Sequence, residues 1–229
     1  MNQPVFQQTG WQRLDNSRPA QDRIEARLKE LGADVQDLDV STVSTSYHAW
    51  RHLADYQGDY AIYNGPLEHC LLEKTLEHYL SLLLINPKKG MTAVDVGSCQ
   101  SVFPAIIRRV YGVECYQQDL DYPAGVHEFR IGSSADQIPL PDRSVDFMTL
   151  HCTFEHFEGG VDSRFVVECR RVLKEGGVCV ILPLYLNEAH CNITGELSEE
   201  NPLETKLSLA EEFRAIGDFE GARSLAEEV

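Results

Sequence analysis

Residues 93–104 read AVDVGSCQSVFP, and this stretch decides the fold. A short apolar run ends in a turn at Gly97, and the residues from Ser101 to Val110 have the pattern of a helix. A strand, a glycine turn and a helix in this order indicate the first unit of a parallel α/β sheet. Glycine at such a turn lets the backbone approach a ligand, and the N-terminus of the following helix is partly positive.

The same alternation of strands and helices continues downstream. Near-continuous apolar strands fit a sheet that is buried on both faces, and the crossovers between parallel strands are right-handed. We therefore predict an α/β fold with a doubly wound, mostly parallel sheet in the order 3-2-1-4-5 and helices on both faces. The further strands are expected at 112–118, 127–131, 145–151 and 178–186, a helix at 163–173 and a turn at 175–177.

The residues before this core form an N-terminal part, 1–90, made of an irregular arm and lid helices. Helical spacing predicts three helices there, at 20–32, 46–56 and 66–85. The last helix has a proline in its first turn, and we expect it to cover part of the site. The predicted core occupies 91–190.

The last part, 191–229, is an acidic linker followed by two amphipathic helical segments over 202–229. A single helical hairpin cannot bury its own apolar face. We therefore expect it to dock on the body, to contact another protein or to form a dimer. Its T-K-L-x-L-A…G-D-x-E-G-A-R pattern resembles the helical tail of FimV-like polar scaffold proteins.

Composition and charge exclude several classes of protein. The 229 residues include 20 Lys and Arg against 36 Asp and Glu, a net charge of −16. A nucleic-acid-binding surface needs a basic stripe, so nucleic acid and anionic membrane surfaces are not expected partners. No apolar run reaches the roughly 18 residues of a membrane span, and no secretory signal is visible. We predict a soluble, cytoplasmic protein.

Candidate metal and disulfide sites are weak. The seven cysteines form no C-x-x-C pair, and several lie in apolar runs such as VCVIL, which indicates reduced thiols and no zinc site. His69, Glu73 and Glu77 have the i, i+4 spacing of metal ligands. We expect them instead to lie on an exposed helix face, with no metal.

Polar groups follow three of the predicted strands. Gly97 follows the first strand, Asp119 ends the second, and GSSADQ follows the third. The carboxyl ends of parallel strands meet at one edge, where open α/β folds bind their ligands, and an acid after the second strand can accept hydrogen bonds from ribose hydroxyls. The full G-x-G-x-x-G phosphate-binding motif is absent.

With these residues in view, the chain resembles the class I S-adenosylmethionine-dependent methyltransferases, in particular the type 11 group. The resemblance covers about residues 63–188 and implies the Rossmann-like methyltransferase fold. The family's sheet usually ends with a sixth and a seventh strand, and neither can be recognised here. Four segments carry the resemblance: AVDVGSCQS, QQDLDYP, IGSSADQIPLPDRSVDFMTLHCTFEHFEGG and ECRRVLKEGGVCVILPLY.

The resemblance implies S-adenosyl-L-methionine as cofactor and a role for each matching residue. The first loop would lie along the methionine part, Asp119 would bind the ribose hydroxyls, and the loop after the third strand would flank the adenine. Cys99 and Ser101 stand where the family usually has glycines, which stiffens the first loop. The expected cofactor contacts are Asp95, Gly97, Ser98, Asp119, Ser134, Ala135, Asp136 and His151.

For catalysis, His151 would face the methyl-transfer site at the end of the fourth strand. A histidine titrates near neutrality and can act as general base for a hydroxyl acceptor. His156 and Glu155 are second candidates, although a capping role is the simpler interpretation of both. Asp95 can equally be a buried acid that orders the loop, and Asp119 can be a solvated strand end.

Two functions follow from these observations. The first is methyl transfer from S-adenosylmethionine to a small-molecule substrate, such as the hydroxyl of a saccharide or a lipid-linked sugar. The second is a catalytically impaired module with the methyltransferase fold that acts in protein interactions. The loop from Gly97 to Ser101 discriminates between them, because an impaired loop would not bind the cofactor.

Overall fold

The computed structural model describes residues 17–56, 68–99 and 101–184. Asp39–Leu184 belongs to one compact unit, and the described residues before Asp39 belong to another, which is treated by itself. The arm predicted before residue 17 and the hairpin predicted over 202–229 lie outside the described residues. The larger unit contains η1 (Val40–Val43), α2 (Ser44–Ala54), α3 (Glu68–Ile85), β1 (Thr92–Val96), α4 (Phe103–Tyr111), β2 (Glu114–His127), β3 (Arg130–Gly132), β4 (Val145–His151), η2 (Phe154–His156), α5 (Val161–Val172) and β5 (Leu173–Leu182).

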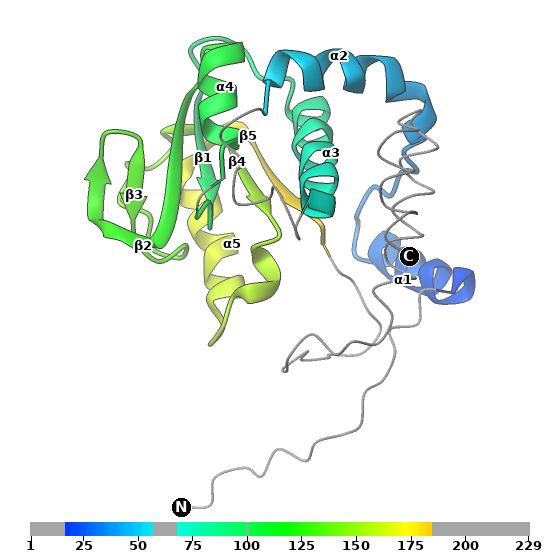
Figure 1. Cartoon of the computed structure of the whole chain (residues 1–229). Helices are drawn as coiled ribbons and strands as arrows, with labels where there is room; N and C mark the ends of the chain where they lie inside the picture. The colour runs from blue at the N-terminus through cyan, green and yellow to red at the C-terminus, as the bar shows by residue number, and fades with distance from the viewer. Residues whose placement is uncertain (1–16, 57–67, 100, 185–229) are drawn as a thin grey trace, which may run out of the picture. The chain divides into compact units, whose positions relative to one another are not determined.

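The five strands form one sheet in the order β3-β2-β1-β4-β5 (Figure 1). Each neighbouring pair is parallel, and β1 lies in the middle with β2 and β4 on its two sides. This confirms the predicted fold class and strand order. β4 spans the predicted residues, and β1 ends directly before Gly97.

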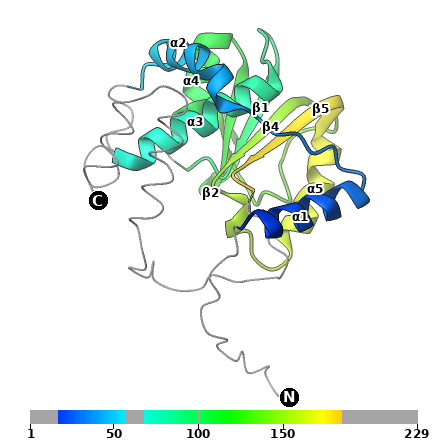
Figure 2. The same ribbon diagram turned by 90° about the vertical axis from the view of Figure 1, so that its right-hand side faces the viewer.

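Helices cover both faces of the sheet, with α3 and α4 on one side and α5 on the other (Figure 2). The first core joins aromatic residues of α2 and α3, such as Trp50 and Tyr79, to Ala93 and Phe147 of the sheet. The second core places Phe165 of α5 among residues of β1, β3 and β4. Successive residues of the central strands therefore enter different cores, which explains their near-continuous apolar pattern.

Three strands differ from the prediction. β2 was expected at 112–118, ended by Asp119, but it comprises Glu114–His127, so Asp119 lies inside it. β3 comprises Arg130–Gly132, not residues 127–131, and the end of β2 pairs with the same three residues in the reverse direction, as in a hairpin. β5 begins at Leu173, before the residues predicted as a turn. The register between β4 and β5 slips between the Val145–Leu173 and Phe147–Val178 pairs, so the predicted turn corresponds to this irregularity.

The smaller unit contributes α1 (Arg18–Glu30), close to the predicted helix at 20–32. Ser17 caps it by accepting a hydrogen bond from the Ala20 backbone N–H at 3.4 Å, and a proline lies in its first turn. Both features are typical signals of a helix start. Gly32, the predicted stop, adopts a φ of 86° directly after the cap.

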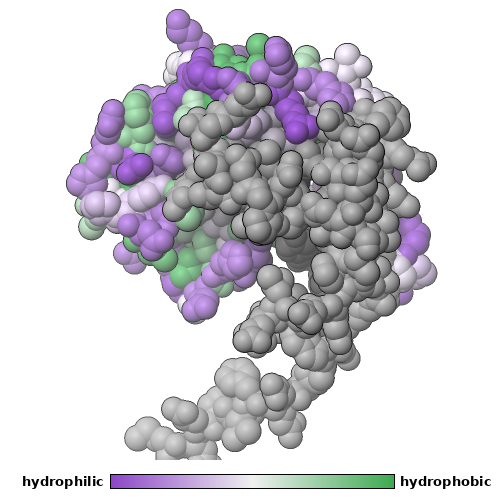
Figure 3. All heavy atoms as spheres, viewed as in Figure 1, coloured by the Kyte–Doolittle hydropathy of each residue, from purple (hydrophilic) through white to green (hydrophobic). Residues whose placement is uncertain are grey.

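In the view of Figure 3, hydrophilic residues cover much of the described surface, and apolar residues form small, separate groups. Among the described helices, none is long and apolar enough to cross a membrane.

The packing of α4 against the sheet can be tested at Ile107, which is fully buried in the first core. We expect Ile107→Ala to lower the free energy of unfolding by about 2–5 kcal/mol, because it leaves a cavity in the core. The matched control is Val167→Ala on α5, where the side chain is 70% exposed and the change should stay within about 0.5 kcal/mol. Urea unfolding followed by circular dichroism measures both, and equal effects would contradict the packing described here.

Candidate functional site

The loop after β1 is shaped by Gly97, whose φ of 61° lies in the left-handed region. A Cβ atom at this position would come within 2.2 Å of Cγ2 of Thr153, from the segment after β4. Only glycine fits this close approach. The close approach of Thr153 thus explains why the tight turn at the sheet edge requires Gly97, as the sequence predicted. A contact between Gly97 and a cofactor stays a prediction.

Asp119 lies half-buried within β2, at the sheet edge, and faces the same loop. Its Oδ2 atom accepts a hydrogen bond from the Cys99 backbone N–H at 2.7 Å, and its Oδ1 atom accepts one from the Asp121 N–H at 3.0 Å. A carboxylate has about four lone-pair positions, so two remain for further donors such as ribose hydroxyls. The geometry fits the proposed ribose role and adds a second one, because Asp119 also holds the first loop in place.

Gln118, the residue before Asp119, connects two of the loops and was not recognised from the sequence. Its Oε1 atom accepts from the Gly97 N–H at 3.2 Å, and its Nε2 atom donates to the Ser133 carbonyl at 2.5 Å. The side chain is buried, so it fixes the distance between the β1 loop and the β3 loop. A polar residue inside a predicted apolar strand was the only signal for it.

The loop after β3 holds the three predicted adenine residues, and their environments differ. Ala135 is buried, whereas the Ser134 hydroxyl donates to Oδ1 of Asp136 at 2.5 Å. Oδ2 of Asp136 forms an ion pair with Nε of Arg164 on α5 at 2.6 Å. The Ser134 hydrogen bond and Arg164 lower the pKa of Asp136. Asp136 therefore anchors the loop, and Ser134 keeps hydroxyl lone pairs that can accept from an amino group.

Leu120 is an apolar residue at the same edge that the sequence analysis did not single out. It follows Asp119 directly and is 74% exposed. An exposed leucine alone is ordinary, but this one is next in sequence to the candidate ribose carboxylate. A contact between Leu120 and a ligand is a prediction.

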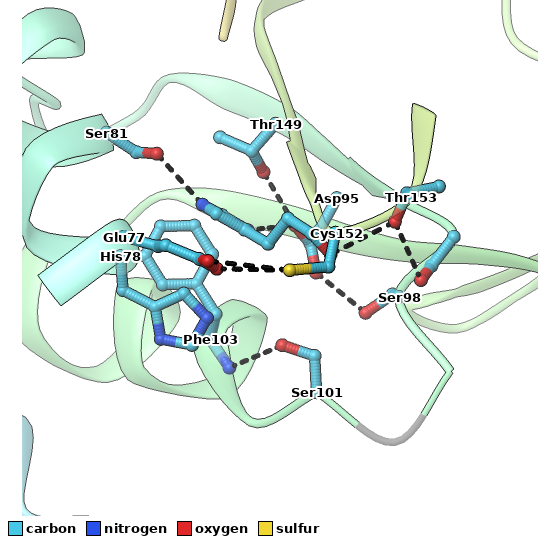
Figure 4. Close-up of polar contacts among 12 residues, drawn as sticks. Glu77, His78, Ser81, Asp95, Ser98, Ser101, Phe103, Thr149, Cys152 and Thr153 are labelled. Atoms are coloured by element: carbon cyan, nitrogen blue, oxygen red, sulfur yellow. Dashed lines mark hydrogen bonds and ion pairs between the residues drawn. The ribbon is translucent and has the colours of Figure 1, made fainter. Parts of the chain in front are cut away.

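Asp95 is deeply buried, and its carboxylate accepts three hydrogen bonds from within the protein (Figure 4). The donors are the Ser98 hydroxyl at 2.8 Å, the Thr149 hydroxyl at 2.7 Å and Nδ1 of His151 at 3.2 Å. This geometry fits the interpretation of Asp95 as a buried acid that orders the loop. A direct contact between Asp95 or Ser98 and the cofactor stays a prediction.

The three candidate bases lie in two different environments. The His151 ring is buried between Asp95 and Ser81 of α3, whose hydroxyl lies 2.8 Å from Nε2. Both ring nitrogens are therefore engaged, and His151 could accept a proton only after Ser81 releases Nε2. Glu155 and His156 are exposed on η2. The catalytic roles of all three remain predictions.

A second polar cluster joins α3 to Cys152, the residue after β4. The Lys74 ammonium donates to Oε2 of Glu77 at 2.9 Å and to Sγ of Cys152 at 2.5 Å. Burial raises the pKa of Glu77 and raises that of Cys152 to about 12. Burial disfavours the charge of Lys74, but its contacts with Glu77 and Cys152 raise its pKa above the usual value.

This cluster shows that the expectation of an exposed helix face was wrong for Glu77. Glu77 is buried because α3 packs onto the end of β4, which the spacing of Glu73 and Glu77 could not reveal. Ligand atoms of Glu73, Glu77 and Cys152 lie within 4.8 Å of one another. The Lys74 ammonium already supplies the positive charge next to Glu77 and Cys152.

Part of the chain is similar to known proteins. Residues 94–181 match the family model of a methyltransferase domain. This match runs from β1 into β5 and supports S-adenosylmethionine as the cofactor. No curated protein sequence matches the chain.

Several solved structures are similar over part of the chain. The YcgJ protein from Bacillus subtilis is 20% identical over 43% of this chain and 46% of its own, with a TM-score of 0.37. A SAM-dependent methyltransferase from Aquifex aeolicus is 21% identical over 65% and 87%, with a TM-score of 0.39. A putative sarcosine dimethylglycine methyltransferase from Galdieria sulphuraria is 17% identical over 80% and 73%, with a TM-score of 0.42. The chain spans about half the length of the first structures it matches.

The loop after β1 yields a test that compares two neighbouring positions. We expect Gly97→Ala to lower the free energy of unfolding by at least about 2 kcal/mol, because the new Cβ meets Thr153 and the φ is left-handed. Cys99 also has a positive φ, of 43°. Cys99→Gly should stay within about 1 kcal/mol of wild type, since relief of the left-handed strain offsets the chain entropy of glycine. Thermal unfolding measures both, and a tolerated Gly97→Ala would refute the loop geometry.

Proposed function

We propose that this protein transfers the methyl group of S-adenosylmethionine to a small-molecule acceptor. The observation that carries the proposal is the preformed edge of the sheet, where one hydrogen bond joins Cys99 to Asp119 and the Gln118 side chain joins Gly97 to Ser133. The loops after β1 and after β3 are thereby fixed to β2, next to a carboxylate that accepts two hydrogen bonds within the described residues. The match of residues 94–181 to a methyltransferase domain supports the same conclusion.

The residues present fit the cofactor group by group. Asp119 would accept the ribose hydroxyls, Leu120 and Ala135 would contact the purine, and the Ser134 hydroxyl would accept from its amino group. Gly97 would admit the chain of the methionine part close to the backbone. When bound, S-adenosylmethionine supplies a methyl group that is already activated on a sulfonium.

The protein's own contribution is then alignment of the acceptor and exclusion of water. The acceptor side would lie near the end of β4, where Cys152 meets Glu77 and Lys74. Burial raises the pKa of Glu77, which makes it a better proton acceptor for a hydroxyl substrate than an exposed glutamate. Glu77 joins His151, His156 and Glu155 as a candidate base. A saccharide or lipid-linked sugar hydroxyl remains the predicted acceptor.

Calorimetry separates the two functions considered from the sequence. An active enzyme should bind S-adenosylhomocysteine with a dissociation constant of about 1 mM or tighter, the ordinary range for substrates. No heat of binding with either S-adenosylmethionine or S-adenosylhomocysteine would favour the non-catalytic module. Cys99 has a strained backbone conformation, with a φ of 43°. Because this strain lies in the predicted cofactor loop, the second function, a non-catalytic module, is tested as well.

The ribose role of Asp119 can be tested by substitution. We expect Asp119→Ala to weaken binding of S-adenosylhomocysteine by about a hundredfold or more, because two charge-assisted hydrogen bonds of roughly 1.5–3 kcal/mol each are lost. Asp119→Asn, which keeps an acceptor for the Cys99 N–H, should lose less. The exposed Asp121→Ala serves as the control and should bind like wild type. Equal affinities for wild type and Asp119→Ala would remove Asp119 from the site.

A further inference from the structure

A continuous chain of buried hydrogen bonds runs from α3 to the loop after β1. Ser81 of α3 contacts Nε2 of His151, Nδ1 of His151 contacts Asp95, and Asp95 accepts from Ser98 in the loop. The distances between the paired atoms are 2.8, 3.2 and 2.8 Å. Figure 4 shows Ser81 on the helix on one side and Ser98 on the loop on the other.

The chemistry of the buried carboxylate fixes the direction of these bonds. An ionised Asp95 can only accept, so Nδ1 of His151 carries the proton in this arrangement. In the neutral imidazole, Nε2 is then an acceptor, and the Ser81 hydroxyl donates to it. Ser81, His151 and Asp95 have the order of a hydrolase triad, but Ser81 is 0% exposed and no substrate could reach its hydroxyl.

We infer that Ser81 is a positioning residue for cofactor binding, which acts on the Ser98 loop through His151 and Asp95. The inference rests on the proposed function, because the loop after β1 is the predicted cofactor contact. Loss of the Ser81 hydroxyl would leave the His151 ring less constrained and weaken its bond to Asp95. The Asp95 carboxylate would then hold Ser98 less firmly, although Ser81 itself lies too deep to touch a ligand.

The test is the affinity for S-adenosylhomocysteine, measured by calorimetry together with thermal unfolding of the ligand-free protein. Ser81→Ala should weaken binding by about three- to tenfold, the loss expected for one hydrogen bond. His151→Asn keeps a donor to Asp95 but cannot reach Ser81, and it should lose a similar factor. Adding Ser81→Ala to His151→Asn should cause no further loss, because both changes break the same chain.

The matched control is Tyr47→Phe, which removes a buried hydroxyl that hydrogen-bonds Thr75 of α3 at 2.9 Å, outside this chain. It should lower the melting temperature without changing the affinity. If Ser81→Ala lowers only the melting temperature, as the control does, Ser81 is merely structural and the inference is overturned. Independent losses that simply add in the double variant would overturn it as well.

A second readout needs no ligand and separates this inference from the proposed function. The Ser98 N–H donates to the Gln118 carbonyl at 2.9 Å, so its hydrogen exchange reports on the loop. Ser81→Ala should accelerate exchange at Ser98 and Cys99, and Tyr47→Phe should not. If wild type bound no S-adenosylhomocysteine but these amides still responded to Ser81→Ala, the proposed function would fail and the positioning chain would stand. Unchanged exchange would refute the chain in either case.

Discussion

The buried carboxylate of Asp95 is the constraint on which the rest of the site depends. A charge in a protein interior is costly unless it is hydrogen-bonded, and Asp95 finds donors in the loop after β1 and twice in β4. Satisfying this one group fixes the rotamer of His151 and the path of the backbone at Ser98. The geometry of the loop after β1 is therefore tied to the stability of the sheet's centre.

Two acids at the carboxyl edge differ in burial and in the number of hydrogen bonds they accept within the protein. Asp95 is 2% exposed and its three donors all belong to the protein, whereas Asp119 is half-buried and keeps lone pairs free of the contacts described for it. Gln118 complements both, because an amide can accept from one loop and donate to another without carrying charge. Buried polar groups thus set the spacing of this edge, and the partly exposed Asp119 is the group proposed for recognition.

The sequence predicted the fold well because the central strands carry strong local signals. The apolar runs located β1 and β4, and Gly97 marked the end of β1. Contacts between distant segments could not be read in the same way: Ser81 and His151 meet only when α3 packs on the sheet, and the same packing buries Glu77. Gln118 was missed because its function depends on two loops whose separation only the folded chain defines. The predicted bounds of the outer strands were wrong because irregular strand pairing leaves no periodic pattern of apolar residues in the sequence.

The exposed Leu120 has a thermodynamic consequence for the proposed function. Its side chain contributes apolar surface at the edge of the sheet. If a ligand covered this surface, its removal from water would lower the heat capacity of the system, and association would become more exothermic as temperature rises. The proposed binding of S-adenosylmethionine would then carry the heat-capacity signature of a hydrophobic contact, made by a leucine next in sequence to the proposed ribose acid.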